Sequence, residues 1–161
     1  MARLVHHLAC PESEEQYRVL LAARRHFGQG GPMRLRHTLP PLVFAGLHLV
    51  RQLYAKSAGE EGAPPHPAGC SMHTRLSRLA GTSVALKKLF QFLHQTTQAL
   101  ADIPRAETAL RLFLQCAQAA SDCQQEPVAY EFMERAYELF EENIPGALAP
   151  GLPFTSFTGS S

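Results

Sequence analysis

Residues 83–101 read SVALKKLFQFLHQTTQALA, and the side chains that would face a core recur there with the spacing of one helix face. They lie three or four residues apart, which matches the roughly 3.6-residue turn of an α-helix and not the alternation of a strand. We therefore expect an amphipathic helix over this stretch. Its stripe consists of Leu86, Leu89, Phe90, Leu93, Thr97 and Leu100.

The same spacing recurs on both sides of this stretch. Helices are predicted from Pro11 to His26, from Thr38 to about Lys56, and in two segments that open at Pro104 and Glu126, with part of another helix at residues 4–8. β-Branched residues are sparse, and no Asn-Gly or Asp-Gly turn lies between alternating runs, so no strand pattern competes. The sequence predicts an all-α fold.

The connections between these helices indicate their arrangement. Residues 102–104 and 122–126 leave room only for short turns, which makes the flanking helices antiparallel neighbours. Residues 41–54 are apolar around most of a helix circumference, so they must be covered on several sides. Antiparallel helix pairs stacked in layers satisfy both conditions. A helical bundle and a helical-repeat solenoid both have such pairs, and no regular repeat period in the sequence distinguishes them.

Proline and glycine divide the chain into four parts. Seven of these residues lie in 57–82, which has no periodic apolar pattern and is interpreted as a flexible Pro/Gly linker. Residues 1–56, with a glycine loop at 28–31, and residues 83–146 are predicted to be helical repeats. Residues 147–161 are predicted to be a disordered tail.

The composition is that of one folded domain in a reducing compartment. The chain has 161 residues, of which 45% are hydrophobic and 18% charged, and this excludes a wholly disordered protein. Its four cysteines form no Cys-x-x-Cys pair, which argues against a disulfide-stapled secreted module. The longest apolar stretch, residues 39–50, is well short of the ~20 residues that span a bilayer, so we expect no transmembrane helix, and we expect no signal peptide either. We expect a cytoplasmic protein.

Charge is distributed unevenly, although the net charge is only +1. Residues 1–56 carry eight basic and three acidic side chains, whereas residues 102–161 carry three basic and nine acidic ones. The small net charge argues against nucleic acid as an obligatory partner. An arginine cluster brackets the glycine loop, and it is available to contact an anionic membrane surface or nucleic acid, or to be solvated and paired within the chain. Its members are Arg24, Arg25, Arg34 and Arg36.

The motifs that commonly mark an active site are missing from the sequence. It has no Gly-x-Ser-x-Gly, His-Glu-x-x-His or Walker sequence. The glycine loop follows a predicted helix instead of a strand, so we interpret it as a helix end and not as a phosphate-binding loop. The glutamates near the C-terminus form the solvated face of a helix, on which Glu131 is expected to pair with Arg135. We expect no enzyme activity.

Metal ligands and reactive thiols are not expected either. His66, Cys70 and His73 have a spacing in which zinc ligands occur, but a tetrahedral site needs a fourth ligand and none is near. Cys116 and Cys123 are too far apart along one helix to bridge, and are expected to be buried thiols. The sequence therefore predicts no metal and no other cofactor.

Several long strings, in one order along the chain, carry a resemblance to a known family. The first two are ARRHFGQGG at residues 23–31 and RLRHTLPPLVFA at residues 34–45. The later strings are FQFLHQTT at 90–97, ALRLFLQCAQAA at 109–120, PVAYEFM at 127–133 and AYELFEE at 136–142. Together they resemble the C-terminal half of the vacuolar protein sorting-associated protein 35 family, the large scaffold subunit of retromer. The resemblance runs from about residue 3 to residue 144 outside the linker.

This resemblance implies an α-solenoid of HEAT-like antiparallel helix pairs without catalytic activity. It also implies a role as a peripheral, cytosolic backbone of an endosomal coat that sorts membrane cargo and returns it to the Golgi. The corresponding half of the family grips the small retromer subunit, which has a phosphoesterase-like fold. Other retromer subunits and cargo adaptors are implied as indirect partners.

The matched loop and helix are where the resemblance places this contact. Phe44 is expected to be a buried aromatic anchor and Arg36 a charge at the rim, and Leu39 and Leu47 complete the contact. Alternatively, Phe44 packs within the solenoid and Arg36 pairs within the loop.

The sequence also departs from the family. The N-terminal motif with which the family grips its arrestin-fold subunit is missing, so binding of that subunit is not implied. Residues 57–82 are longer and richer in proline than expected, and the family pattern is lost after Pro145. We expect a solenoid truncated at both ends, whose uncapped apolar faces favour marginal stability or self-association. An inactive fragment is the remaining alternative.

Overall fold

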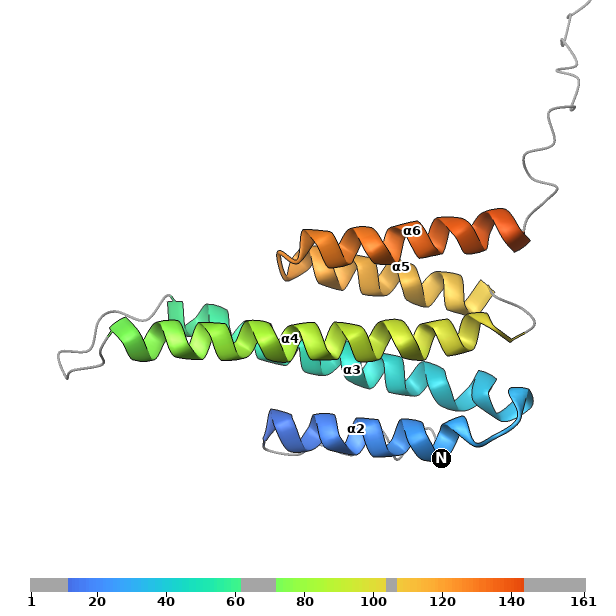
Figure 1. Cartoon of the computed structure of the whole chain (residues 1–161), viewed down its shortest axis with the longest axis horizontal. Coiled ribbons are helices and arrows are strands. Elements are labelled where there is room, and N and C mark those ends of the chain that lie inside the picture. The colour runs from blue at the N-terminus through green and yellow to red at the C-terminus, as the bar shows by residue number, and fades with distance from the viewer. Residues whose placement is uncertain (1–11, 62–71, 104–106, 144–161) are drawn as a thin grey trace, which may run out of the picture.

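The structure, a computed structural model, describes residues 12–61, 72–103 and 107–143 (Figure 1). These residues form helices joined by turns, and none of them lies in a strand, which confirms the predicted all-α fold. Within these ranges, every helix is too short or too polar to cross a membrane. The helices are α2 (Ser13–Gly28), α3 (Pro32–Glu61), α4 (Met72–Ala101), α5 (Glu107–Asp122) and α6 (Glu126–Asn143).

The helices form two layers in a stack that runs from α2 at one end to α6 at the other (Figure 1). Each helix packs against the next along the chain, and helices two apart also touch, since α2 contacts α4, α4 contacts α6 and α3 contacts α5. One layer therefore contains α2, α4 and α6, and the other contains α3 and α5. This zigzag of antiparallel helices is the architecture of an α-solenoid, the second arrangement that the sequence left open.

Buried aromatic rings join three of these helices. The ring centroid of Phe132 in α6 lies 6.3 Å from that of Phe90 in α4 and 6.0 Å from that of Phe113 in α5. The ring of His94 in α4 packs on Phe113 and Phe132 at 5.8 and 5.4 Å. Each such pair contributes about 0.5–1.5 kcal/mol beyond the burial of its apolar area. His94 is therefore part of the packing between α4, α5 and α6.

Glycine allows α3 and α4 to approach each other closely at Gly46. A Cβ atom added at Gly46 would lie only 2.8 Å from Cδ2 of Leu93, a completely buried side chain of α4. This face of α3 is therefore turned toward α4. Because residues two apart point about 200° apart around a helix, Phe44 points away from α4.

The start of α3 differs from the prediction. The sequence predicts a start at Thr38, but α3 begins at Pro32 and carries Pro40 and Pro41 in its interior. Proline suits the first helical turn, where its missing N–H has no helical partner anyway. In the interior, each proline removes a hydrogen bond to the carbonyl four residues earlier, which normally ends or bends a helix. Here the flanking leucines and valine belong to the core, and we infer that their packing outweighs this cost.

The predicted linker at residues 57–82 is wrong for most of its length. Residues 57–61 continue α3 and residues 72–82 form the first part of α4. The three prolines of the stretch all lie within 62–71, which is outside the described residues. The prolines therefore indicate a break only within 62–71, and the residues on both sides are compatible with a helix. The tail at 147–161 and the partial helix at residues 4–8 also lie outside the described residues.

The glycine loop ends a helix, as predicted. α2 ends at Gly28, and the N–H of Gly30 donates to the carbonyl oxygen of Phe27 at 3.0 Å. α3 then starts at Pro32. The tight turn makes the two helices antiparallel neighbours.

The turn between α5 and α6 uses a left-handed residue. Gln124 has a φ of 57°, the only positive φ of a non-glycine residue in the described part of the chain. The N–H groups of Gln124 and Gln125 donate to the carbonyls of Ser121 and Ala120, both at 2.9 Å. These two bonds form a Schellman motif, in which glycine is usually found at the left-handed position. The motif turns the chain back so that α6 packs along α5.

Candidate partner-binding surface

The outer face of α3 carries the strongest candidate for a partner contact. Phe44 is 43% exposed, although the residues on both sides of it are buried. His48 and Arg51 follow at helical spacing and are exposed as well. Leu114 of α5, the other helix of this layer, is exposed to the same extent as Phe44. An exposed aromatic ring framed by polar side chains has the composition of an interface anchor.

Arg36 lies on the same helix and is exposed, as a charge at the rim requires. It precedes Phe44 by eight residues, which corresponds to about 12 Å along a helix axis. The prolines at 40 and 41 lie between the two side chains. Both residues are thus on one helix, although two prolines interrupt its hydrogen bonding between them.

Leu39 and Leu47 do not belong to this exposed surface. They are only 1% and 3% exposed and join the hydrophobic core. Their prediction as contact residues is therefore corrected. The sequence could not separate them from Phe44, because α3 is apolar around most of its circumference and packs against α2, α4 and α5.

Arg24 links two helices and is not available as part of a surface cluster. Its Nη1 donates to Oε1 of Gln95 at 2.9 Å, and its Nη2 donates to the backbone carbonyl of Gln95 at 3.0 Å. Its guanidinium carbon lies 6.0 Å from the centroid of the Phe92 ring. Burial lowers the pKa of Arg24 from its ordinary value, although the group stays charged. Arg24 therefore holds α2 against α4, which is the internal pairing that the sequence offered as an alternative.

The rest of the arginine cluster lies on the surface. Arg25, Arg34 and Arg36 are exposed, at the end of α2 and the start of α3. They flank the glycine loop, so three cationic groups remain available for an anionic partner. Because Arg24 is bound to Gln95, the cluster has one cation fewer for binding an anion than the sequence suggests.

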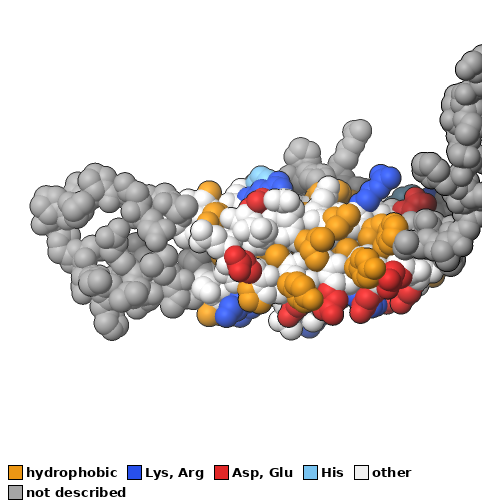
Figure 2. Space-filling view, turned by 90° about the horizontal axis from the view of Figure 1, so that it is seen from above, with side chains coloured by type: hydrophobic (Ala, Val, Ile, Leu, Met, Phe, Trp, Pro, Cys, Tyr) orange, Lys and Arg blue, Asp and Glu red, His pale blue; other side chains and the backbone are white. Residues whose placement is uncertain are grey.

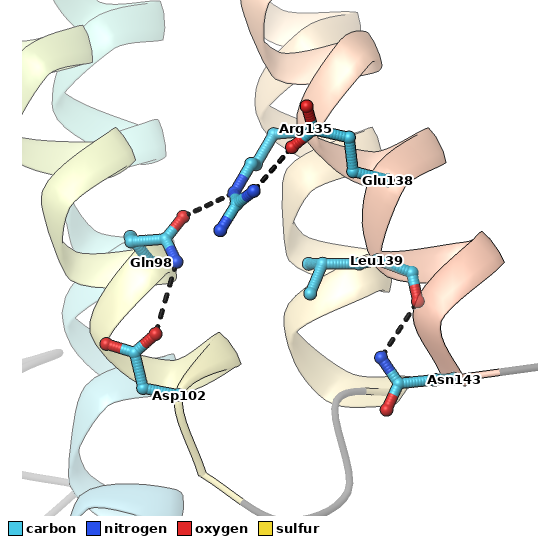
Figure 3. Close-up of polar contacts among 6 residues, drawn as sticks. All are labelled: Gln98, Asp102, Arg135, Glu138, Leu139 and Asn143. Carbon is cyan, nitrogen blue, oxygen red and sulfur yellow. Dashed lines mark hydrogen bonds and ion pairs between the residues drawn. The ribbon is translucent and has the colours of Figure 1, made fainter.

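Arg135 connects α6 to α4 through side chains (Figure 3). Its Nε donates to Oε1 of Gln98 at 2.7 Å, and Nε2 of Gln98 donates to Oδ1 of Asp102 at 3.2 Å. Its Nη1 forms an ion pair with Glu138. The predicted pairing with Glu131 is replaced by these contacts, because the half-buried Arg135 side chain points toward α4. The network positions α6 against α4.

The two cysteines are buried thiols, as predicted. Cys116 and Cys123 are both free and buried. Burial raises the pKa of Cys116 to about 12, and burial together with the nearby Asp122 raises the pKa of Cys123. A thiol held neutral in this way is a poor nucleophile and a poor metal ligand. Both side chains serve packing.

No group of three potential metal ligands is found among the residues that the structure describes. Three residues were considered as zinc ligands. His66 and Cys70 lie outside the residues that the structure describes, and the side chain of His73 is not described either. The structure therefore leaves this triplet untested.

One exposed apolar stripe was missed by the sequence reasoning. Tyr130, Met133 and Tyr137 of α6 are 70%, 50% and 60% exposed. Met133 directly follows Phe132 in the sequence, but only Phe132 is buried. The signal was available, since Tyr130, Met133 and Tyr137 are three and four residues apart and form a second stripe on the same helix.

Comparisons with known proteins agree with one another. The family model described as vacuolar protein sorting-associated protein 35 matches residues 1–149. The chain is 44% identical over 152 residues to vacuolar protein sorting-associated protein 35B of Arabidopsis thaliana, and 40% identical over 149 residues to 35C of the same plant. It is 33% identical over 145 residues to vacuolar protein sorting-associated protein 35 of Dictyostelium discoideum. These alignments cover 92%, 92% and 89% of the chain, but only 17% of each relative. The chain thus spans a small part of the length of the relatives it matches.

Proposed function

Because the chain belongs to the vacuolar protein sorting-associated protein 35 family, we propose that it acts as a non-enzymatic scaffold segment of the retromer coat. The coat sorts cargo at endosomes and returns it to the Golgi. The segment works on the cytosolic face of the endosome membrane, which it reaches through the complex. Its direct partner is the small retromer subunit with a phosphoesterase-like fold.

The single observation that carries the proposal is the exposure of Phe44. Burying a half-exposed Phe ring costs no polar desolvation and removes apolar surface from water, at about 25 cal/mol per Å². Every neighbour of Phe44 from Leu42 to Leu47 is buried, so this ring has no place in the core. An aromatic side chain that a well-packed helix leaves outside is the expected form of an interface anchor.

The surface around Phe44 also suits a protein partner. His48, Arg51 and the more distant Arg36 are exposed polar groups on the same helix. Polar groups around an apolar centre keep water away from the anchor when the partner is bound. We therefore propose Phe44 as the anchor and Arg36 as a charge at the rim, and we exclude Leu39 and Leu47 from the contact.

Substitution of Phe44 tests this proposal. Phe44→Asp should weaken binding of the small retromer subunit by about 30-fold or more, because loss of a hot-spot residue costs at least about 2 kcal/mol. Val84→Asp is the matched control, since Val84 is an exposed apolar residue on α4 in the other layer. Titration calorimetry measures both affinities, and circular dichroism verifies that the helices are retained. Unchanged affinity of a folded Phe44→Asp protein would remove the assigned surface.

Salt dependence separates this proposal from contact through the arginines. Arg25, Arg34 and Arg36 are exposed, and the alternative is that they bind an anionic membrane or nucleic acid. Binding through phosphate contacts falls steeply with salt concentration, whereas an apolar anchor is nearly insensitive to it. Binding to anionic vesicles or to nucleic acid that disappears at high salt would favour the arginine contact instead.

A further inference from the structure

Two consecutive prolines lie in α3 one turn before Phe44. Pro40 and Pro41 precede Phe44 by four and three residues, so all three lie on one side of the helix. Among the described helices, only α3 contains proline beyond its first turn. Exposed hydrophobic side chains also gather among acidic ones at the α6 end of the stack (Figure 2), but Pro127 of α6 lies in the first turn. The combination of interior prolines and an exposed ring is therefore specific to α3, which lies within the stack and not at either end (Figure 1).

The backbone carbonyl of His37 has no helical donor. In a helix, a carbonyl accepts from the N–H four residues later, or from the N–H three residues later where the turn is tighter. For His37 these positions are Pro41 and Pro40, and proline has no N–H. The carbonyl of Arg36 keeps one of its two possible donors, the N–H of Leu39. Within α3, the carbonyl of His37 is therefore the one that loses both.

Neighbouring side chains do not replace the missing donor. The hydroxyl of Thr38 donates to the carbonyl oxygen of Arg34 at 3.0 Å, so it is already engaged. None of the other side-chain hydrogen bonds between described residues ends at His37. His37 is exposed and Pro41 is half-buried. Because a proline ring also pushes away the carbonyl four residues earlier, the carbonyl oxygen of His37 is turned toward solvent.

We propose that this carbonyl is an acceptor site in the partner contact, and that the small retromer subunit donates a hydrogen bond to it. The proposal rests on the proposed function, because it takes Phe44 as the anchor of the same contact. His37 and Phe44 are seven residues apart, which is about 10 Å along a helix axis, and helical carbonyls point toward the later residue. A typical interface covers about 800 Å² on each partner, so a protein seated on Phe44 also covers this carbonyl.

The surroundings of the carbonyl determine which donor suits it. A partner that covers an acceptor without offering a donor separates it from water and gains nothing in return, so the partner has to supply a donor here. Arg34 and Arg36 are exposed within one turn of His37, and their positive charges repel a lysine or arginine of the partner. A neutral donor avoids this repulsion. Hydroxyl groups, side-chain amides and backbone N–H groups meet the requirement.

Substitution of each proline by valine tests the proposal. Pro41→Val restores the N–H that closes the carbonyl of His37, whereas Pro40→Val restores the N–H for Arg36 and is the matched control. Both variants lose one half-buried ring, retain an apolar side chain of similar size and remove an interior proline, so the helices should be retained. Circular dichroism verifies this, and titration calorimetry of the full chain with the small retromer subunit measures the affinities.

The two variants should differ in affinity. One hydrogen bond changes an affinity by about 2- to 12-fold, so Pro41→Val should bind about 5-fold more weakly than the unmodified chain. Pro40→Val should stay within about 2-fold of the unmodified chain. The carbon-13 resonance of the His37 carbonyl responds to hydrogen bonding, and it should shift when the unmodified chain is saturated with the small subunit. A resonance that does not move would overturn the proposal, whatever the variants do.

Phe44→Asp separates failure of this proposal from failure of the proposed function. If Phe44→Asp loses binding while Pro41→Val binds as well as the unmodified chain, the carbonyl site is wrong and Phe44 remains the anchor. Equal weakening by the two valine variants would also overturn the proposal, because only the loss of a ring is common to both. If the unmodified chain does not bind the small subunit, or if Phe44→Asp binds as tightly, the proposed function fails and this proposal fails with it.

Discussion

Replacing Arg24 by alanine should destabilise the fold while leaving partner binding intact. The guanidinium of Arg24 spans two helices, since it donates to the side chain and to the backbone carbonyl of Gln95 at 2.9 and 3.0 Å. It also lies 6.0 Å from the centroid of the Phe92 ring. In Arg24→Ala both hydrogen bonds are lost, and the contact with the ring is lost with them.

The expected loss is about 2 kcal/mol. Hydrogen bonds from a charged donor contribute about 1.5–3 kcal/mol when well buried, and we take roughly 1 kcal/mol for each because Arg24 is only partly buried. The cation–π contact lies at the outer limit of its range and adds at most about 0.5 kcal/mol. For a chain of this size, a loss of 2 kcal/mol lowers the melting temperature by about 4–8 °C.

Urea unfolding followed by circular dichroism measures this loss, and Arg25→Ala is the matched control. Arg25 is the next residue on α2 and is exposed, so removing the same charge there should change the free energy of unfolding by less than about 0.5 kcal/mol. Arg24→Lys keeps the charge but cannot reach both acceptors of Gln95, and should recover less than half of the loss. Equal stability of Arg24→Ala and Arg25→Ala would refute the assignment of Arg24 as a link between α2 and α4.

Two further predictions concern stability and reactivity. Gln124→Gly should stabilise the protein by about 1 kcal/mol, because glycine adopts the left-handed φ of 57° without the penalty that a side chain carries, and scanning calorimetry would contradict this if the melting temperature fell. Since burial raises the pKa of Cys116 from 9.0 to about 12, its thiolate population below pH 9 is about 1000-fold smaller when folded than when unfolded, so alkylation should require unfolding. The raised pKa also makes stability depend on pH: its contribution to the free energy of unfolding is complete below pH 9 and disappears as the pH rises toward 12, so the protein should become less stable over that interval. Rapid alkylation of native Cys116 at pH 8 would contradict both expectations.

Helical periodicity was sufficient to predict the fold class. The stripes that include Phe90, Phe113 and Phe132 all form the core, because an amphipathic helix buries its apolar face wherever it packs. The start of α3 was predicted too late in the chain, because proline normally occupies the first turn of a helix and therefore indicates a start near Pro40. In the structure, packing of the surrounding apolar residues keeps the helix continuous from Pro32 past both prolines. The predicted linker at residues 57–82 fails at both ends, because its three prolines are confined to 62–71 and the flanking residues belong to α3 and α4.

The candidate site was predicted only in part. The resemblance indicated the segment that contains Phe44. Four contact residues were predicted on this helix, which is apolar on most sides, and two of them, Leu39 and Leu47, are core residues. Which apolar residue remains outside depends on the neighbours of α3 in space, and the sequence does not contain this directly. The internal role of Arg24 depends likewise on Gln95, 71 residues away.

Cross-linking from position 44 tests most directly whether the outer face of α3 grips the partner. A photo-reactive phenylalanine derivative replaces Phe44 in the full chain, which is then mixed with the small retromer subunit, irradiated and analysed by mass spectrometry. The same derivative at Tyr130 on α6 is the control, because that side chain is exposed at the end of the stack. We expect a covalent adduct with the small subunit from position 44 and none from position 130. An adduct from position 130 alone would contradict the assigned surface.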